Sequence, residues 1–544
     1  MRSPYVTERR PREMEAQKLR EEYRFGEADV AYARLKTRLS SGPLLGAQHD
    51  EVERVLGEEG RALLRELMQS HITLRGLGDT GPTVTGGDGV TRTHRRVHER
   101  ALTTVFGPVR VRRMGYRTRG LNSLYPVDAA LNLPRESYSH GMRLIAAREA
   151  SKASFHEVGL TIERTTGVRV PHRQIEDLAL RAATDFDAFY EERQASAIAA
   201  RATSSSILVL SADGKGVVMR PEALREATRK AAAVRTHKMG TRLSPGEKRN
   251  AKRMAEVATV YSIAPYPRTP EQIVRGSAEN DDGPAPRPRP EHKRVWASIE
   301  QDTPEVIDGA FREALSRDPT RVKRWVALVD GNAPQIEAFE ERARHHKVKL
   351  TIVLDVIHVI EYLWGAVAAF ETLGTAGAEA WVSERLLRIL HGQASDVAAG
   401  MRRSATKRGL STVTRKPVDR CAKYLRRHAR YLRYDEYLAD GLPIGTGVIE
   451  GACRYLVKDR MDITGARWTL SGAEAVLRLR ALHASHDFDA YWTYHVAQEH
   501  LRNHLSSYAD HRPPATAAVP RAHARDASRI RPVHLRLMPD LPAK

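Results

Sequence analysis

The spacing of apolar residues predicts that the chain begins with a helical region. Between residues 50 and 72, apolar side chains recur every three or four positions, which is the period of one face of an α-helix. The Gly-rich stretch GLGDTGPTVTGGDG then breaks this pattern. We therefore expect a helical N-terminal region over residues 1–92.

From residue 100 the pattern changes to alternation between apolar and polar side chains. The stretch ALTTVFGPVRVRRMGY holds two such runs on either side of Gly107 and Pro108, which predicts a β-hairpin. We expect Arg110, Arg112 and Arg113 to face outward from this hairpin, where they could contact phosphates.

A helix-turn-helix is predicted next. Helical patterns in residues 137–182 are interrupted at Gly167 and restart at Pro171. The second helix would then begin with His172, Arg173 and Gln174, and the first turn of such a helix contacts base edges in the major groove. Arg suits guanine and Gln suits adenine. We therefore assign residues 93–185 to a DNA-binding region, although an ordinary helix pair around a Gly turn would give the same pattern.

The central part of the chain alternates between strands and helices. Apolar, β-branched runs predict five strands, at residues 207–213, 256–266, 295–300, 325–331 and 348–355, with helices at 304–317 and 333–346. This order predicts a mixed α/β sheet over residues 204–364. Helical, strongly basic sequence then fills residues 365–440 as an insertion, and residues 441–490 supply a final helix. The Pro-, Ala- and Arg-rich residues 510–544 favour disorder.

Composition indicates a binding partner and a cellular compartment for the protein. Among 544 residues, 88 Lys and Arg stand against 67 Asp and Glu, so the formal net charge is +21. Such a charge attracts polyanions and makes double-stranded DNA the leading partner, with a solubility charge as the alternative. Two cysteines build neither a disulfide framework nor a four-cysteine zinc site. With no membrane-length apolar run and no secretion signal, a cytoplasmic, nucleoid-associated protein is expected.

Three carboxylates occupy positions typical of a metal site. Asp213 ends the strand ILVLSA, Asp330 ends WVALV, and Glu450 lies in the first turn of a helix after a Gly-rich loop. Side chains at strand ends converge without disturbing a core, and Mg²⁺ prefers oxygen ligands. Each acid also has a purely structural explanation, because an Asp before Gly can close a turn and a Glu favours a helix N-terminus.

Four motifs together resemble a known family. SADGKG, ALVDG, VLDVIHVIEYLW and GLPIGTGVIEGACRYLVKDRMDITGARW are similar to the bacterial insertion-sequence transposases of the ISKra type, members of the DDE superfamily with an RNase H-like core. The resemblance covers about residues 95–490. Its last motif, which contains Cys453 and Arg460, is the most specific part.

The resemblance implies both a fold and a reaction. The fold would be an RNase H-like mixed sheet with a helical insertion, preceded by the helical and β-rich DNA-binding region. Asp213, Asp330 and Glu450 would be the catalytic acids and would hold two Mg²⁺ or Mn²⁺ ions. The enzyme would bind terminal inverted repeats, cleave DNA strands and transfer them to a target, as a homo-oligomer on DNA.

Further residues are implied in supporting roles. Asp355 and His358 match the Asp-x-x-His element of Mutator-like and hAT-like transposases; we interpret them as an accessory pair, with Asp355 as the rival for the second acid. Lys215, Arg454, Lys458 and Arg467 stand beside the acids in the sequence and are expected to contact DNA phosphates, although solvated surface positions would explain Arg454, Lys458 and Arg467 equally well. An inactive DNA-binding descendant and a nuclease of the same fold remain as alternatives.

Overall fold

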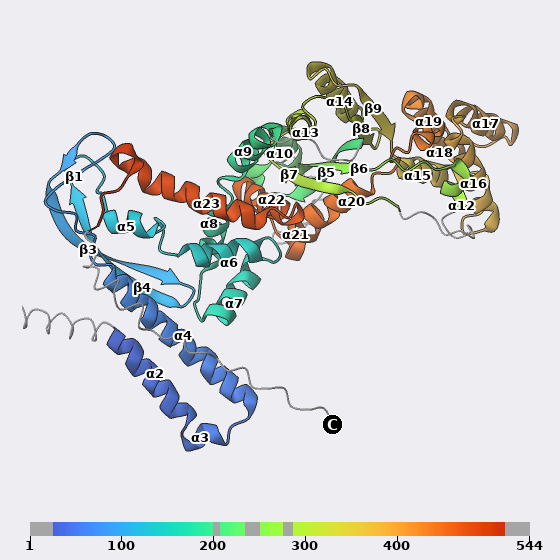
Figure 1. The fold of residues 1–544 in the computed structure, drawn as a ribbon. Coiled ribbons are helices and arrows are strands. Elements are labelled where there is room, and N and C mark those ends of the chain that lie inside the picture. The colour runs from blue at the N-terminus through green and yellow to red at the C-terminus, as the bar shows by residue number, and fades with distance from the viewer. Residues whose placement is uncertain (1–24, 200–206, 234–250, 276–286, 517–544) are drawn as a thin grey trace, which may run out of the picture. The chain divides into compact units, whose positions relative to one another are not determined.

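A computed structural model describes residues 25–199, 207–233, 251–275 and 287–516 (Figure 1). The chain divides into two units. The first comprises residues 1–145, 160–170 and 496–544, and the second comprises residues 146–159 and 171–495. Residues 517–544, which belong to the segment predicted to be disordered, lie outside the described residues.

The first unit begins with helices and continues with a β-hairpin. Its long helix α4 (His49–Leu74) confirms the helix predicted from the apolar spacing. The other elements of this part are α2 (Gly26–Leu39), α3 (Gly42–Leu45), β1 (Val84–Thr85), β2 (Thr91–Arg92), β3 (His94–Thr104), β4 (Gly107–Arg117) and α5 (Pro126–Leu131).

The hairpin of β3 and β4 packs one face on α4. A core cluster joins Ile72 of α4 to Leu102, Val109 and Val111 of the hairpin. The side-chain amide of Gln69 also exchanges two hydrogen bonds with the backbone of residue 110, at 2.7 and 3.0 Å. The predicted hairpin is therefore confirmed, and α4 both covers its apolar face and bonds to its backbone.

One expectation for the hairpin is wrong. Arg110 and Arg112 are exposed as predicted, but Arg113 is half-buried and forms an ion pair with the buried Asp128. Neighbouring residues of a strand point to opposite faces, so Arg112 and Arg113 cannot both face solvent.

The C-terminal part of the chain returns to complete the first unit. Tyr508 is buried in a cluster with Val84, Tyr116 and Leu124, and its backbone forms an antiparallel bridge with Gly86. Sequence patterns gave no sign of this contact, because it joins residues about four hundred positions apart.

Three helices follow the hairpin region. They are α6 (His140–Ala150), α7 (Phe155–Thr166) and α8 (His172–Ala182). Gly167 follows α7 with φ +72°, a left-handed conformation that Gly adopts without strain. The predicted helices and the break between them are confirmed, while their use as a DNA-binding helix-turn-helix stays a prediction.

The second unit is built on a mixed five-stranded sheet, as predicted. Its strands are β5 (Ile207–Val218), β6 (Lys252–Ile263), β7 (Glu291–Ser298), β8 (Arg324–Val329) and β9 (Leu350–Leu354). They lie in the order β7-β6-β5-β8-β9. β5, β8 and β9 are parallel, whereas β6 is antiparallel to both β5 and β7. β5, which is the first of these five strands in the sequence, therefore lies in the centre of the sheet.

Helices cover both faces of this sheet. Leu208, Val209 and Leu210 point alternately to the two faces, yet all three are fully buried. α13 packs against β5 and β6, and α22 packs against β7. The helices of this part are α9 (Phe186–Ala199), α10 (Glu226–Ala233), α12 (Pro270–Arg275), α13 (Thr303–Arg317), α14 (Ala333–His345), α20 (Gly447–Ala452), α21 (Asp459–Met461), α22 (Leu470–Ala484) and α23 (Phe488–Asn503).

The predicted helical insertion is also present. α15 (Val356–Val367) leads from β9 into it, and its own helices are α16 (Ala376–Leu390), α17 (Ala394–Lys407), α18 (Thr412–Arg427) and α19 (Tyr434–Ala439). Three tyrosine hydroxyls tie it to the ends of β8 and β9. Tyr424 donates to the carbonyl of residue 330, Tyr434 to that of 354 and Tyr437 to that of 352, at 2.8, 2.8 and 3.2 Å. The bonds to residues 352 and 354 satisfy backbone acceptors on β9, which is the edge strand of the sheet.

Among the residues that the structure describes, no helix combines the length and the apolar character that crossing a membrane requires.

A buried ion-pair network supports the sheet. Glu313 of α13 pairs with Arg294 of β7 and Arg317, and it accepts a hydrogen bond from Gln194. Burial alone would raise the pKa of Glu313, but the charges of the two arginines outweigh it and lower the pKa to about 2.

We predict that Glu313→Gln destabilises the fold by about 3–5 kcal/mol at pH 7, because it leaves two buried guanidinium groups uncompensated. Urea unfolding measures this. Since the folded-state pKa is depressed, the stabilisation is complete above about pH 4.5 and declines as the pH falls toward 2. The wild type should therefore lose stability more steeply than the variant in that range. Glu337→Gln, an exposed change on α14, is the control; equal stability of Glu313→Gln and this control would contradict the prediction.

Candidate functional site

The parallel strands set three acids level with one another. The last paired residues are Ser211 with Leu328 between β5 and β8, and Val329 with Leu354 between β8 and β9. The same registers, continued further along the strands, place Asp213 opposite Asp330 and Asp330 opposite Asp355. The backbone N–H of Asp355 donates to the carbonyl of Val329 at 2.8 Å, which fixes this level. Neighbouring strands lie about 4.8 Å apart, so the three acids share one edge of the sheet, where β8 and β9 end. The prediction that Asp213 ends its strand is wrong, because β5 continues to Val218 and Asp213 still pairs with Val257 of β6.

The loop before α20 brings a fourth acid to this edge. The backbone N–H of Val356 donates to the carbonyl of Ile444 at 2.9 Å, and the N–H of Thr446 donates to Asp355 Oδ1 at 2.9 Å. The hydroxyl of Thr446 then donates to Glu450 Oε1 at 2.9 Å. Thr446 therefore connects the carboxylates of Asp355 and Glu450.

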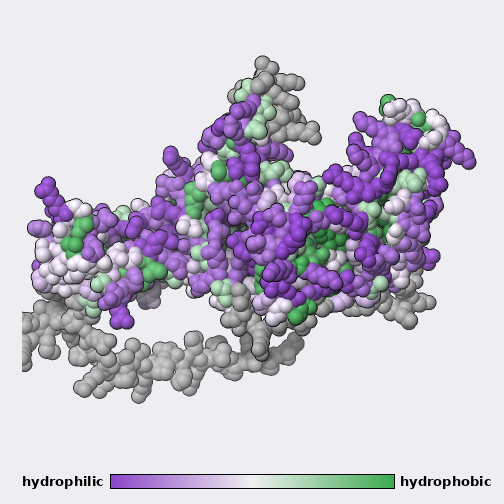
Figure 2. All heavy atoms as spheres, turned by 90° about the horizontal axis from the view of Figure 1, so that it is seen from above, coloured by the Kyte–Doolittle hydropathy of each residue, from purple (hydrophilic) through white to green (hydrophobic). Residues whose placement is uncertain are grey.

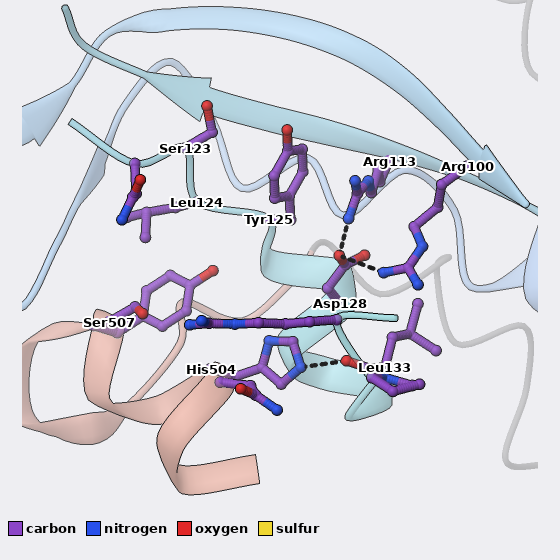
Figure 3. Close-up of a pocket in the computed structure, with 14 residues that line it drawn as sticks. Arg100, Arg113, Ser123, Leu124, Tyr125, Asp128, Leu133, His504 and Ser507 are labelled. Carbon is purple, nitrogen blue, oxygen red and sulfur yellow. Dashed lines mark hydrogen bonds and ion pairs between the residues drawn. The ribbon is translucent and has the colours of Figure 1, made fainter. Parts of the chain in front are cut away.

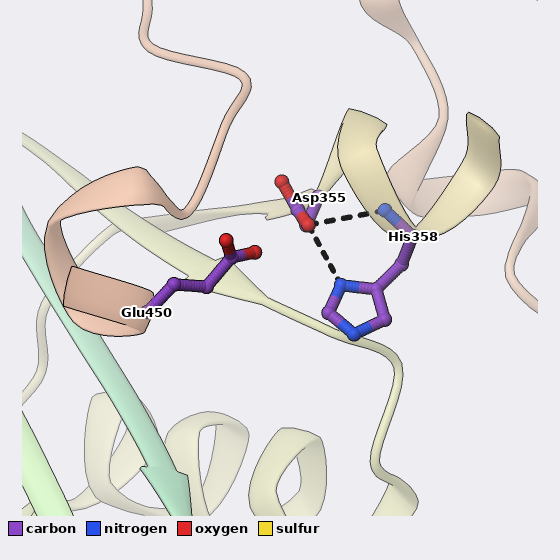
Figure 4. A group of neighbouring side chains, drawn as sticks. All are labelled: Asp355, His358 and Glu450. Carbon is purple, nitrogen blue, oxygen red and sulfur yellow. Dashed lines mark hydrogen bonds and ion pairs between the residues drawn. The ribbon is translucent and has the colours of Figure 1, made fainter. Parts of the chain in front are cut away.

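The result is a compact group of Asp355, His358 and Glu450 (Figure 4). Each offers one ligand atom, and these atoms all lie within 4.8 Å of one another. Asp355 is fully buried, His358 is half-buried and Glu450 is exposed. The group therefore has a buried base and an open side.

Asp355 and His358 form a hydrogen-bonded ion pair. His358 Nδ1 lies 2.7 Å from Asp355 Oδ2, and the backbone N–H of residue 358 donates to the same oxygen at 3.1 Å. The hydrogen bond to Asp355 raises the pKa of His358 to about 9, against the effect of burial. Burial raises the pKa of Asp355, but its bonds with His358 and Thr446 lower it overall. At neutral pH the site therefore holds an imidazolium beside its acids.

Asp213 lies next to the segment that carries Glu450. Its Oδ2 accepts a hydrogen bond from the thiol of Cys453 at 3.2 Å, and its Oδ1 accepts one from the backbone N–H of Gly214 at 2.7 Å. Burial and the charge of Asp213 raise the pKa of Cys453, so the thiol stays protonated and donates. Cys453 opens a π-helical turn, Cys453–Lys458, and such turns often occur at functional sites.

Asp330 is held by its own turn and by the insertion. Its Oδ1 accepts from the backbone N–H of Asn332 at 2.8 Å, and its carbonyl accepts from Tyr424. Gly331 has φ +96° and lies against the Tyr424 ring, so a side chain there would be strained and crowded. The charge of Asp330 contributes to the raised pKa of His358.

The structure thus brings together the predicted accessory pair and the third acid. Asp213, Asp330 and Glu450 remain the predicted ligand set, with Asp213 contacting Cys453 and Asp330 level with its neighbours. The short distances between their ligand atoms favour Asp355 over Asp330 as the second acid. Asp355 and Glu450 belong to one group and both bind Thr446.

A divalent cation fits the donors at this edge. Two ligands across an ion with bonds of about 2.1 Å lie no more than about 4.2 Å apart, close to the 4.8 Å limit observed in the group. Carboxylate oxygens from Asp355 and Glu450, with Asp213 beyond Cys453, are the type that Mg²⁺ and Mn²⁺ prefer. His358 Nδ1 faces Asp355 and the ring is protonated, so His358 acts as a charged neighbour rather than a ligand.

The residues predicted to read DNA bases are exposed. His172, Arg173 and Gln174 occupy the first turn of α8 with their side chains in solvent. His172 Nε2 also lies 3.1 Å from Nδ1 of His156. Arg173 and Gln174 are therefore the better placed pair for base contacts.

The residues predicted to contact phosphates have mixed surroundings. Arg454 and Lys458 are exposed on the π-helical turn, and Arg454 Nε lies 3.8 Å from Asp459. Lys215 is half-buried on β5, and its positive charge partly opposes the rise in the pKa of Cys453. Arg467 is exposed and lines a cavity.

Sequence reasoning missed two residues of the site. Thr446, four residues before Glu450, fixes its carboxylate, and Cys453, three residues after it, binds Asp213 rather than only packing. Their spacing of three and four around Glu450 was a usable signal, because it places all three on one face of a helix.

The first unit contains a cavity of its own, of about 460 Å³ (Figure 3). Arg100 and Arg113 converge on the buried Asp128, and the guanidinium of Arg113 lies 3.8 Å from the centroid of the Tyr125 ring. Burial lowers the pKa of His504 to about 4, so this residue is neutral at pH 7. The two arginines outweigh Asp128, and the cavity is net positive.

No protein-family model matches the chain, and a search of curated proteins finds no match.

We predict that the chain binds Mn²⁺ and that Glu450→Gln weakens this binding by about tenfold or more, because an amide is a poor ligand for a hard cation. The electron paramagnetic resonance signal of free Mn²⁺ measures the affinity. Glu361→Gln is the matched control, since Glu361 is exposed on α15 and its charge reaches His358, but it lies outside the group. Equal Mn²⁺ affinity of Glu450→Gln and the wild type would rule out Glu450 as a ligand.

Proposed function

We propose that this protein is a DNA transposase of the ISKra type, which binds the terminal inverted repeats of an insertion sequence and cleaves and transfers its strands with Mg²⁺ or Mn²⁺. One observation carries the proposal. Asp213, Asp330 and Asp355 lie level with one another on three neighbouring parallel strands, and a ligand atom of Glu450, from the helix after the insertion, lies within 4.8 Å of one of Asp355, in a chain whose net charge is +21.

The topology of the second unit supports the RNase H-like part of the proposal. An RNase H-like sheet has its first strand in the centre, and only its second strand is antiparallel to the first. β5 is central here, and β6 is the antiparallel second strand. Asp213 on β5, Asp330 after β8 and Glu450 on the helix after the insertion are the positions that the resemblance assigns to the catalytic acids.

The chemistry follows from what the side chains can hold. Two metal ions bound by the acids would activate the attacking oxygen and stabilise the leaving one. Thr446 orients Glu450, and Cys453 orients Asp213. The imidazolium of His358 places a positive charge beside the acids, where it would attract the phosphate of an entering strand.

DNA binding is supported by the distribution of basic side chains. Most of the surface in view in Figure 2 is hydrophilic, in line with a 28% content of charged residues. The insertion is especially basic on α17, α18 and the turn between them, where the exposed residues are Arg403, Lys407, Arg408, Lys416, Arg420, Lys423, Arg426 and Arg427. Such a surface binds the DNA backbone independently of sequence.

We predict that Glu450→Gln separates binding from chemistry. The change removes one negative charge from a site that approaches DNA, so affinity should persist or increase, whereas nicking should fall by about a hundredfold or more. The assays are gel retardation at two salt concentrations and Mg²⁺-dependent nicking of a terminal-repeat duplex, whose sequence comes from the DNA that flanks the gene. Glu361→Gln should behave as the wild type does.

The same assays separate the alternatives. A wild-type protein that binds the repeat but never nicks it would be a DNA-binding descendant. One that nicks but does not join a pre-nicked end to a target would be a nuclease. If Glu450→Gln nicks at the wild-type rate, the assignment of the acids is wrong. If the variant loses both nicking and DNA binding, Glu450 has a structural role.

We predict that Arg173→Ala costs about 1–3 kcal/mol of binding to the terminal repeat and relaxes specificity at one base pair, as expected for a bidentate contact with guanine. Binding to a set of single-base variants of the repeat measures this. Arg169→Ala, an exposed change in the turn before α8, is the control and should leave base preference intact. A uniform loss of affinity across all DNA sequences would make Arg173 a phosphate contact instead.

A further inference from the structure

Arg460 is a buried cation that forms no ion pair with the residues that the structure describes. Its exposed fraction is 2%, and its guanidinium lies 4.8 Å from the centroid of the Trp468 ring and 5.5 Å from that of Phe155. Nε donates to the carbonyl of Ala150 at 2.9 Å, whereas Nη2 is buried without a hydrogen-bond partner. Within the described ranges, no carboxylate forms an ion pair with Arg460.

This burial is costly, because a charge removed from water needs a partner. Burial and the nearby charge of Arg480 lower the pKa of Arg460 to about 10, so it is still charged at neutral pH. Arg480 provides a contrast. It donates to three carbonyl oxygens, those of Leu456, Ser151 and Tyr455. The protein thus satisfies one of these two arginines and leaves the other short of acceptors.

Arg460 lines a cavity that two further arginines share. The cavity has a volume of about 190 Å³, and Arg220 and Arg467 line it with exposed side chains. One acid, Glu176, also lines it and accepts a hydrogen bond from Thr469 at 3.3 Å. Three cations against one acid leave the cavity net positive. Since a water occupies about 30 Å³, the space suffices for a phosphate group with a few waters.

The cavity is fixed to the strand that bears Asp213. The backbone N–H of Trp468 donates to the carbonyl of Val218 at 3.1 Å, and the N–H of Arg220 donates to the carbonyl of Trp468 at 2.8 Å. Seven residues of chain separate Asp213 from Arg220, a span of at most about 25 Å. Along duplex DNA this corresponds to about seven base pairs or fewer.

We infer that Arg460, with Arg220 and Arg467, binds a phosphate group, and that this phosphate belongs to the DNA backbone a few base pairs from the position of the acids. The inference rests on the proposed DNA binding but not on strand cleavage. The incoming phosphate supplies the counter-ion that the described part of the chain does not provide, and the Trp468 and Phe155 rings hold the guanidinium in place for it.

The test replaces Arg460 with Met, which keeps most of the side-chain volume and removes the charge. Without phosphate, Arg460→Met should unfold at the same temperature as the wild type or higher, since an unpaired buried charge has been removed. Inorganic phosphate, titrated at constant ionic strength against chloride, should raise the unfolding temperature of the wild type but not of the variant. The phosphate affinity of Arg460→Met should be about ten- to a hundredfold lower than that of the wild type.

Duplex DNA of arbitrary sequence forms the second arm. If the backbone is the source of the phosphate, the slope of log affinity against log salt should decrease by about one in Arg460→Met. A lost phosphate response with an unchanged slope would overturn the DNA source and assign the cavity to free phosphate. A wild type that responds to phosphate but binds no DNA would refute the proposed function and leave the phosphate site standing.

Two controls guard against a purely structural role. Arg480→Met should lower the unfolding temperature and leave the phosphate response intact, because its guanidinium is already satisfied. Arg467→Ala, at an exposed position, should weaken the phosphate response without changing stability. If Arg460→Met lowers the unfolding temperature in chloride and keeps the phosphate response, Arg460 is a structural residue and the inference fails.

Discussion

The carboxylate of Asp355 is the group on which the arrangement of the candidate site depends. It accepts hydrogen bonds from the backbone N–H and the ring N–H of His358, in the first turn of α15, and from the backbone N–H of Thr446, which precedes α20. A single buried anion therefore connects the end of β9 to the start of the insertion and to the segment that follows it. Because these bonds stabilise its charged form, Asp355 remains ionised despite complete burial. Removing it would release both segments together with Glu450.

This constraint explains how the sheet tolerates a long insertion. The insertion, residues 365–440, lies between β9 and α20. The segments on both sides of it are fixed by the Asp355 carboxylate, and the insertion is held by the tyrosine hydroxyls that bond to the ends of β8 and β9. The stacking of Tyr362 on Tyr424, with centroids 3.9 Å apart, joins α15 to α18. The insertion can therefore carry a dense basic surface without displacing the acids.

Much of the fold could be predicted from local patterns, whereas most contacts of the site could not. Strands, helices and the insertion follow from hydrophobic periodicity, and the Asp-x-x-His spacing predicted a pair that the structure contains. The prediction that Arg113 faces outward is wrong, because Arg113 alternates with Arg112 along β4 and pairs with the buried Asp128. The contact of Cys453 with Asp213 and the return of Tyr508 to the first unit depend on packing between distant segments, which periodicity does not encode.

The charges of the second unit follow one logic. Asp355 and Glu450 lie close together at one site, and Arg460 is buried with no carboxylate partner among the residues that the structure describes. Both arrangements are unfavourable in the free protein, since like charges repel and an unpaired ion loses its hydration. Under the proposed function, metal ions would neutralise the acids and a DNA phosphate would pair with Arg460. That function therefore links the stability of the folded chain to the DNA and the metal ions that it would bind.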